Sequence, residues 1–318
     1  MKRIFLILIG ICVFYYALKI NSFDLLNTFS TSSKVLRIVS IKNILICLFF
    51  YFTGIVGRAM RLFYLSGKIN ISIMKLLYLQ VLSTSMQLAL PFRLGDGARI
   101  FIFKDYLKGI AESAFIFIVE KILDTITLFS ILILMIWTND KFLNLIADSR
   151  FIILVSILLT TLYVLPDLLE IIYRNLLVRS GNNKIKTFLT KFIRDILLAR
   201  QKTIKRVNGK VVNLICITYV IWAFDSLSFS FIASALNQEY LFSFLVGPLC
   251  ALSGFLPSPP LGIYGSVNIG MFWAEKLSGI NNIASFSSIY SIFIYGSVVL
   301  FSVILFCSVN LFRMKKKS

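Results

Sequence analysis

The chain has 318 residues, of which 58% are hydrophobic, and its mean hydropathy is +0.88. This composition excludes an ordinary soluble globular domain, because apolar blocks recur along the whole length. The blocks stay apolar for about 15 to 25 residues, as membrane-spanning helices do, whereas the strands of a barrel alternate over about ten residues. The sequence therefore predicts an all-α, polytopic helical membrane protein.

The apolar blocks define candidate helical segments in chain order. The first, Ile4–Leu18, follows Met-Lys-Arg and precedes no small-residue cleavage site, so we expect a retained span rather than a signal peptide. The others are Asn43–Tyr64, Ile73–Leu90, Ala114–Trp137, Phe151–Leu165, Val211–Leu236, Leu241–Leu256, Gly262–Ala274 and Ile283–Phe312.

Two of these segments are each followed by a break and a short apolar piece. Ile73–Leu90 precedes PFRLGDGAR at residues 91–99 and then IFIFKDY. Leu241–Leu256 leads into LPSPPLGIYG at residues 256–265 and a piece that is well short of the roughly 20 residues needed to cross a bilayer. We expect two re-entrant helical hairpins, since non-helical backbone at membrane depth is tolerated only beside protein or a water-filled cavity.

The basic residues indicate the orientation of the spans, because Lys and Arg favour the cytoplasmic side. With both termini inside and the hairpins entering from opposite faces, 25 of the 33 basic residues are cytoplasmic. The loop at residues 22–42 is an exception, since it keeps Lys34, Arg37 and Lys42 outside. Residues 1–137 and 151–312 then repeat the same elements in opposite sense. The chain is therefore predicted to be one membrane domain built as an inverted repeat.

Charged residues within the apolar segments are the candidate functional groups, because each costs about 2.5 to 3.5 kcal/mol at the bilayer centre. Arg58 and Arg61, spaced i, i+3, either grip a phosphate or mark the cytoplasmic end of a span. Glu120 and Asp124, spaced i, i+4, either position arginines, bind a cationic headgroup, or only join helices through Arg. Asp225 is either an interhelical partner or a proton-linked site.

The break after the third segment carries three more charges. Arg93, Asp96 and Arg99 are expected at the tip of the first hairpin, where they either contact a substrate or belong to an ordinary loop. A matching break in the other half favours a transport site near the midplane. Arg is also the side chain best suited to hold a phosphate, because its planar fork donates two parallel hydrogen bonds.

Other kinds of chemistry are not expected. The chain has no His, and its five Cys lie in apolar blocks without a CxxC spacing, so no metal and no cofactor is predicted. It has no P-loop, and an enzyme without His would depend on its acids as general bases, so we expect no enzyme. The net charge of +19 also suits nucleic acid, but the topology accounts for most basic residues. We therefore expect no nucleic-acid partner.

A basic amphipathic helix is predicted within a cytoplasmic region at residues 171–210. Its apolar positions follow helical spacing with Lys and Arg opposite, and they are Ile185, Phe188, Leu189, Phe192, Ile193, Ile196 and Leu197. Such a helix is expected to lie in the membrane interface against anionic lipid.

Four motifs resemble the membrane domain of the lysylphosphatidylglycerol synthase/flippase family, in the order seen there. They are RAMRLFYL at 58–65, LPFRLGDGAR at 90–99, IVEKILDTITLF at 118–129 and LPSPPLGIYG at 256–265. Three positions depart from the family pattern: Asp96 stands for Glu, Lys121 for Arg, and Asn268 for Glu. Asp96 keeps its charge, whereas Asn268 loses it. The chain ends RMKKKS without the family's aminoacyl-transferase domain, so the resemblance implies lipid translocation without lysyl-lipid synthesis.

The resemblance and the charges together predict a lipid flippase of the cell (plasma or inner) membrane. It is expected to bind an anionic phospholipid or lipid-linked headgroup and to move it across the bilayer. The expected substrate-binding residues are Arg58, Arg61, Arg93, Asp96, Arg99, Glu120, Asp124, Pro257, Gly262, Gly265 and Asn268. The alternative is a non-transporting membrane scaffold in envelope lipid or glycan assembly, with envelope-biosynthesis proteins as partners.

Overall fold

The computed structural model describes residues 40–67, 71–89, 94–107, 109–138, 170–175, 184–234 and 297–298. Within these ranges every regular element is a helix, which confirms the predicted all-α class. The predicted spans at residues 4–18, 151–165, 241–256 and 262–274 lie outside the described residues, as does nearly all of 283–312. The second hairpin and the inverted repeat therefore stay predictions.

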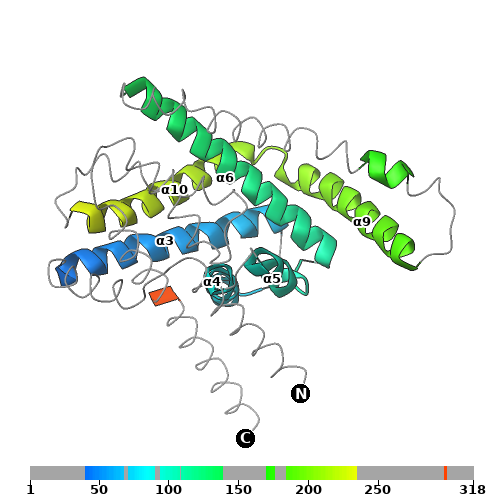
Figure 1. Ribbon diagram of the computed structural model, residues 1–318, viewed down its shortest axis with the longest axis horizontal. Helices are drawn as coiled ribbons and strands as arrows, with labels where there is room; N and C mark the ends of the chain where they lie inside the picture. The colour runs from blue at the N-terminus through cyan, green and yellow to red at the C-terminus, as the bar shows by residue number, and fades with distance from the viewer. Residues whose placement is uncertain are drawn as a thin grey trace, which may run out of the picture. The chain divides into compact units, whose positions relative to one another are not determined.

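The longer described helices follow the predicted segments closely (Figure 1). Their bounds are α3 Ile41–Ser66, α4 Ile73–Ala89, α5 Leu94–Phe103, α6 Ile110–Thr138, α9 Lys184–Val207 and α10 Val211–Ser234. Two of them are long and apolar enough to cross a membrane, namely α3 with 26 residues and the part Val211–Phe231 of α10 with 21. Both coincide with predicted spans.

Helix α5 begins earlier than the sequence suggested. It starts at Leu94, so Asp96 and Arg99 lie in its first two turns instead of in a loop. Asp96 is in the first turn, where the positive end of the helix dipole favours a carboxylate. Asp96 and Arg99 are therefore held by helical backbone.

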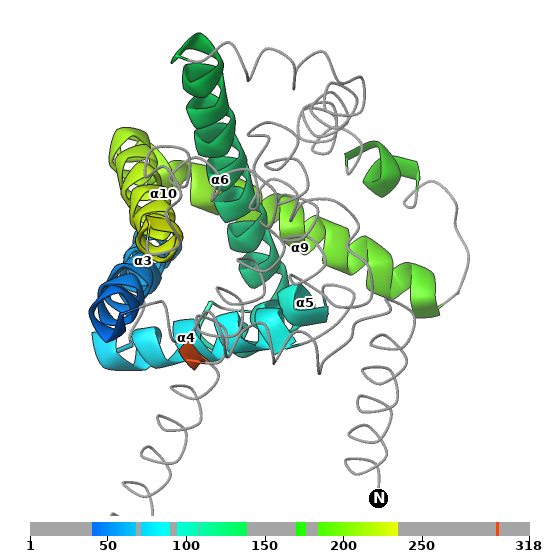
Figure 2. The ribbon, with the colours of Figure 1, turned by 60° about the vertical axis from the view of Figure 1, so that its left-hand side comes forward.

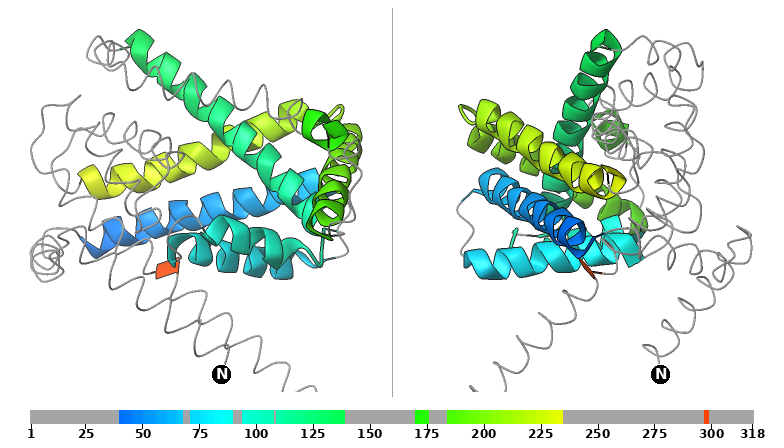
Figure 3. Two further views of the ribbon diagram at one scale, coloured as in Figure 1. Left: turned by 45° about the vertical axis from the view of Figure 1, so that its right-hand side comes forward. Right: turned by 90° about the vertical axis from the view of Figure 1, so that its left-hand side faces the viewer.

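The chain divides into two compact units. The first unit comprises Met1–Val56, Ile73–Arg99 and Val220–Ser318. In it, the beginning of α3 runs antiparallel to the end of α10 (Figure 3). The ring of Phe50 stacks on Phe224 and Phe231, with centroids 5.8 and 5.4 Å away, and the Cys47 thiol lies 3.2 Å from the Ser228 hydroxyl.

The second unit comprises Gly57–Ser72 and Ile100–Tyr219. Helix α9 packs against α6 in this unit (Figure 2), and its residues Ile193, Ile196 and Ala199 are buried. The residue after α3, Gly67, has a φ of 72°, a left-handed conformation that commonly ends a helix. A Cβ added at Gly67 would lie 3.3 Å from Cδ of Arg206, so α9 approaches the end of α3 closely.

Candidate functional site

Helix α4 carries a run of buried polar side chains. Gln80 and Ser83 are fully buried, and Thr84 and Ser85 nearly so. The hydroxyls of Ser83 and Thr84 each donate to the backbone carbonyl of Gln80, at 2.9 Å in both cases. Hydroxyl groups in an apolar environment must find such acceptors, and the helix supplies them from its own backbone. The carboxamide of Gln80 remains available for contacts outside α4.

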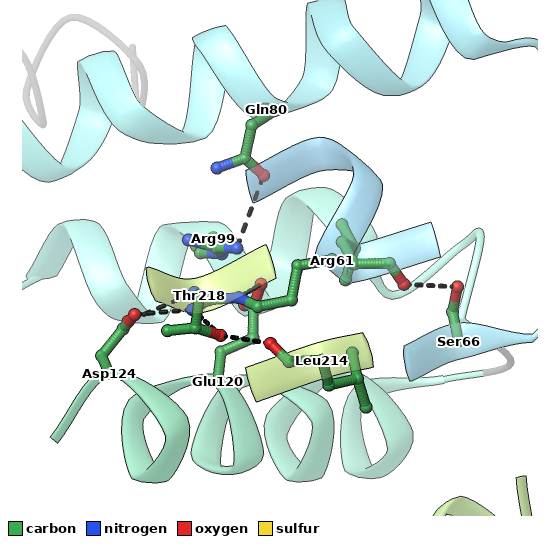
Figure 4. Close-up of polar contacts among 9 residues, drawn as sticks. Arg61, Ser66, Gln80, Arg99, Glu120, Asp124, Leu214 and Thr218 are labelled. Atoms are coloured by element: carbon green, nitrogen blue, oxygen red, sulfur yellow. Dashed lines mark hydrogen bonds and ion pairs between the residues drawn. The ribbon is translucent and has the colours of Figure 1, made fainter. Parts of the chain in front are cut away.

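Two glutamines of α4 contact the charged residues of α5 in the first unit. Gln87 donates from Nε2 to Oδ1 of Asp96 at 2.7 Å, and Arg99 donates from Nη2 to Oε1 of Gln80 at 3.4 Å. Figure 4 shows the second contact. Arg99 is only 7% exposed. We call α4, the start of α5 and these contacts the hairpin, because the two helical arms lie against each other.

A glycine allows the arms of the hairpin to meet. A Cβ added at Gly95 would lie 2.3 Å from the Cα of Gln87, a distance that no real Cβ maintains. The neighbouring Gly97 has open space at the same position. Of the two glycines in the LGDG sequence, Gly95 is thus the one that the packing requires.

A buried ionic cluster lies in the second unit (Figure 4). Arg61 of α3 donates from Nη1 and Nη2 to the two carboxylate oxygens of Asp124 on α6, at 2.6 and 3.2 Å. Its Nε lies 3.6 Å from Oε1 of Glu120, and its Nη1 also contacts the hydroxyl of Thr218 on α10 at 3.4 Å. Arg61 and Glu120 are each only 2% exposed. We call Arg61, Glu120 and Asp124 the ionic cluster.

The ionic cluster supports the interpretation that the acids of α6 join helices through Arg. The guanidinium of Arg61 makes a two-point, charge-assisted contact with Asp124, and such pairs are strong and geometrically specific. Removing each of these charged groups from water costs free energy, and the attraction between the opposite charges offsets that cost. Arg58 lies one turn earlier on α3 and is half-buried. The assignment of Arg58 and Arg61 to phosphate binding stays a prediction.

The structure brings some of the predicted site residues together and leaves others outside its described part. Arg61, Glu120 and Asp124 form one cluster, while Asp96 and Arg99 contact α4 in the other unit. Asp225 lies on α10 and is half-buried. The remaining predicted residues lie outside the described ranges, and they are Arg93, Pro257, Gly262, Gly265 and Asn268. Their roles stay predictions.

Several polar contacts were not anticipated from the sequence. Gln80 and Gln87 contact Arg99 and Asp96, although neither carries a charge that marks it within an apolar segment. A signal was present, because the run QVLSTSMQ places polar residues at i, i+3, i+4 and i+7, which is one face of a helix. The hydroxyl of Thr218 had no comparable signal.

A second unanticipated contact joins three helices of the second unit. Arg206 near the end of α9 donates to the backbone carbonyl of Ser66 at 3.0 Å and to Oε1 of Glu112 at 2.6 Å. Ser66 is the last residue of α3, so its carbonyl has no intrahelical partner, and a basic side chain is well suited to satisfy it. The contact fixes the end of α9 against α3 and α6.

Comparison with known proteins identifies the chain's relatives. The family model described as lysylphosphatidylglycerol synthase TM region matches residues 4–307. The chain belongs to this family. No curated protein and no solved structure matched the chain. Membership in the lysylphosphatidylglycerol synthase TM region family, together with the long apolar helices, makes the chain a membrane protein of lipid or envelope biology.

Proposed function

We propose that this protein is a flippase that binds an anionic phospholipid or lipid-linked headgroup and moves it across the cell membrane. The family supports a role in lipid biology, and the hairpin supports the choice of an anionic headgroup. The proposal includes a multi-pass topology with both termini in the cytoplasm, because that orientation places 25 of the 33 basic residues on the cytoplasmic side. It includes no catalytic step and no cofactor.

The observation that carries the proposal is the pair of buried donors in the hairpin. The guanidinium of Arg99 donates to the carboxamide oxygen of Gln80, and Gln80 is fully buried. The carboxamide nitrogen of Gln80 is buried and forms no hydrogen bond within the described residues. A buried polar group without an acceptor costs about 1 to 3 kcal/mol. A ligand rich in acceptor oxygens, as a phosphate is, accepts from the Gln80 carboxamide nitrogen and suits the positive charge of Arg99 beside it.

The charged residues then divide into two roles. Arg99 contacts the phosphate, and the phosphate-binding roles that the sequence predicts for Arg93 and Arg58 are kept as part of the proposal. Arg61 positions helices, since Asp124 already holds its guanidinium by two hydrogen bonds. Asp96 orients the first turn of α5 through Gln87. Replacing Arg99 should therefore affect substrate binding, while replacing Arg61 should affect folding.

The test is translocation of fluorescent lipids in vesicles reconstituted with purified protein, with anionic, zwitterionic and polyprenyl-phosphate headgroups compared. We expect Arg99→Gln to slow transport of the preferred headgroup by about ten- to a hundredfold, the range expected for one lost charged hydrogen bond. The matched control is Lys75→Gln, which removes an exposed positive charge from the other arm of the hairpin. It should transport at the wild-type rate.

The outcomes separate the two candidate functions. Headgroup-dependent transport that is lost in Arg99→Gln and kept in Lys75→Gln would establish a flippase and its substrate class. Wild-type transport in Arg99→Gln would refute the assignment of the hairpin as the binding site. An absence of transport with every headgroup, in protein that is folded and inserted, would favour the non-transporting scaffold.

A further inference from the structure

The apolar face of α9 is covered along only part of its length. In the middle of the helix, Ile193, Ile196 and Ala199 are buried where α9 packs against α6. Near its beginning, Phe188 is 66% exposed and Leu189 is 41% exposed. Large exposed apolar side chains at adjacent positions of a basic helix indicate a surface that contacts something else.

The exposed residues belong to the same face as the buried ones. Phe188 and Phe192 lie one turn apart, and their rings stack with centroids 6.2 Å apart. Phe192 is in turn one turn before Ile196, which is buried. The apolar stripe therefore runs continuously from the packed middle of α9 into its exposed beginning.

The far end of α9 is held in place within its unit. Arg206 makes its two contacts with Ser66 and Glu112 there, and Gly67 approaches its side chain closely. With one end fixed and the middle packed against α6, the helix presents its first turns in a defined direction. The exposed part of the stripe is thus held in a fixed position, because the rest of the same rigid helix is packed against the protein.

We propose that the first turns of α9, around Phe188 and Leu189, insert into the surface of an anionic bilayer. The charge of the helix selects this partner, since α9 has eight basic residues and one acidic residue. Lys191 and Arg194 are both exposed on the polar side of α9, away from the apolar stripe. Apolar residues flanked by Lys and Arg bind anionic lipid by partial insertion and by attraction to the headgroups. A second copy of this chain would bring the same positive charge and be repelled.

This surface is independent of the proposed transport, so its test uses no transport assay. The full chain, with its native cysteines replaced by Ala, receives an environment-sensitive fluorophore at Phe188→Cys. The matched control carries the label at Gln201→Cys, which is exposed on the opposite side of α9. Each labelled protein is reconstituted into vesicles of phosphatidylcholine alone, or of phosphatidylcholine with one-third phosphatidylglycerol.

We expect the emission at position 188 to shift to the blue in anionic vesicles and to stay near the aqueous value in zwitterionic ones. The label at position 201 should report water in both. The double variant Lys191→Gln, Arg194→Gln should lower the ratio of inserted to free helix by about 25-fold, since each basic residue near the surface contributes about fivefold. The charge-conserving pair Lys191→Arg, Arg194→Lys should retain the shift.

Three results would overturn the proposal. The first is an aqueous emission at position 188 in anionic vesicles, equal to that at position 201. The second is a blue shift of equal size in both vesicle types, or one that grows with protein density, which would assign the surface to the protein itself or to a second copy. The third is a blue shift at position 188 that appears only when an acidic soluble protein is added to the vesicles, because the partner of this surface would then be a protein and not the bilayer.

Discussion

Replacing Gly95 by Ala should separate the two arms of the hairpin. The added carbon would lie 2.3 Å from Cα of Gln87, while ordinary van der Waals contact begins at 3.4 Å, so the arms must move apart by about 1.1 Å. The hydrogen bond between Gln87 and Asp96, now 2.7 Å, would then lengthen to about 3.8 Å and be lost. Overpacking and the lost charged hydrogen bond together should cost about 3 kcal/mol.

The matched control is Gly97→Ala, two residues along the same helix. A Cβ at Gly97 meets nothing within 4 Å, and Ala in a helix is favoured over Gly by about 0.5 to 1 kcal/mol. In detergent, Gly95→Ala should lower the melting temperature by about 6 °C or more and Gly97→Ala should raise it slightly. Transport should fall only in Gly95→Ala. Equal behaviour of the two variants, in either direction, would refute the argument from close packing.

Two further predictions concern the second unit, and the same melting measurement checks both. Arg61→Met should destabilise the protein by about 3 to 5 kcal/mol, because it leaves buried carboxylates without their cation, and adding Asp124→Asn should restore part of that loss. An equal loss with and without Asp124→Asn would count against the ionic cluster. Arg206→Gln should cost about 2 kcal/mol through its contacts with Glu112 and Ser66, whereas Arg194→Gln on the same helix should cost less than about 0.5 kcal/mol. Equal losses in these two variants would contradict the role of Arg206.

The helices of the described part follow from hydrophobicity and chain punctuation. An apolar run that ends near Gly67 predicts α3, and the run after Lys210 predicts α10, because both need only the local pattern. The amphipathic pattern also predicted α9. It assigned the whole apolar face to lipid, however, while the structure buries Ile193 and Ile196 beside α6. A single sequence gives the face of a helix but not which neighbour covers it.

The candidate site was predictable only in its charges. The spacing of Glu120 and Asp124 indicated that both face one way on α6, and the need to neutralise them indicated an arginine. Which arginine it is depends on tertiary structure, and Arg61 rather than Arg58 forms the two-point contact with Asp124. Gln80 was missed because an uncharged amide costs less in an apolar segment and leaves a weaker pattern.

Two glycines that end segments of the second unit face different constraints. Gly67 has φ 72° and also meets the side chain of Arg206, whereas Gly209 has φ 82° with nothing within 4 Å of an added Cβ. Asn tolerates the left-handed conformation better than other residues with side chains, so it should be accepted at position 209 and tolerated less well at position 67, where Arg206 would have to shift. In a saturation mutagenesis experiment, the two positions would therefore differ in which substitutions survive selection. That difference would show, without any structure determination, that α9 sits against the end of α3 in living cells.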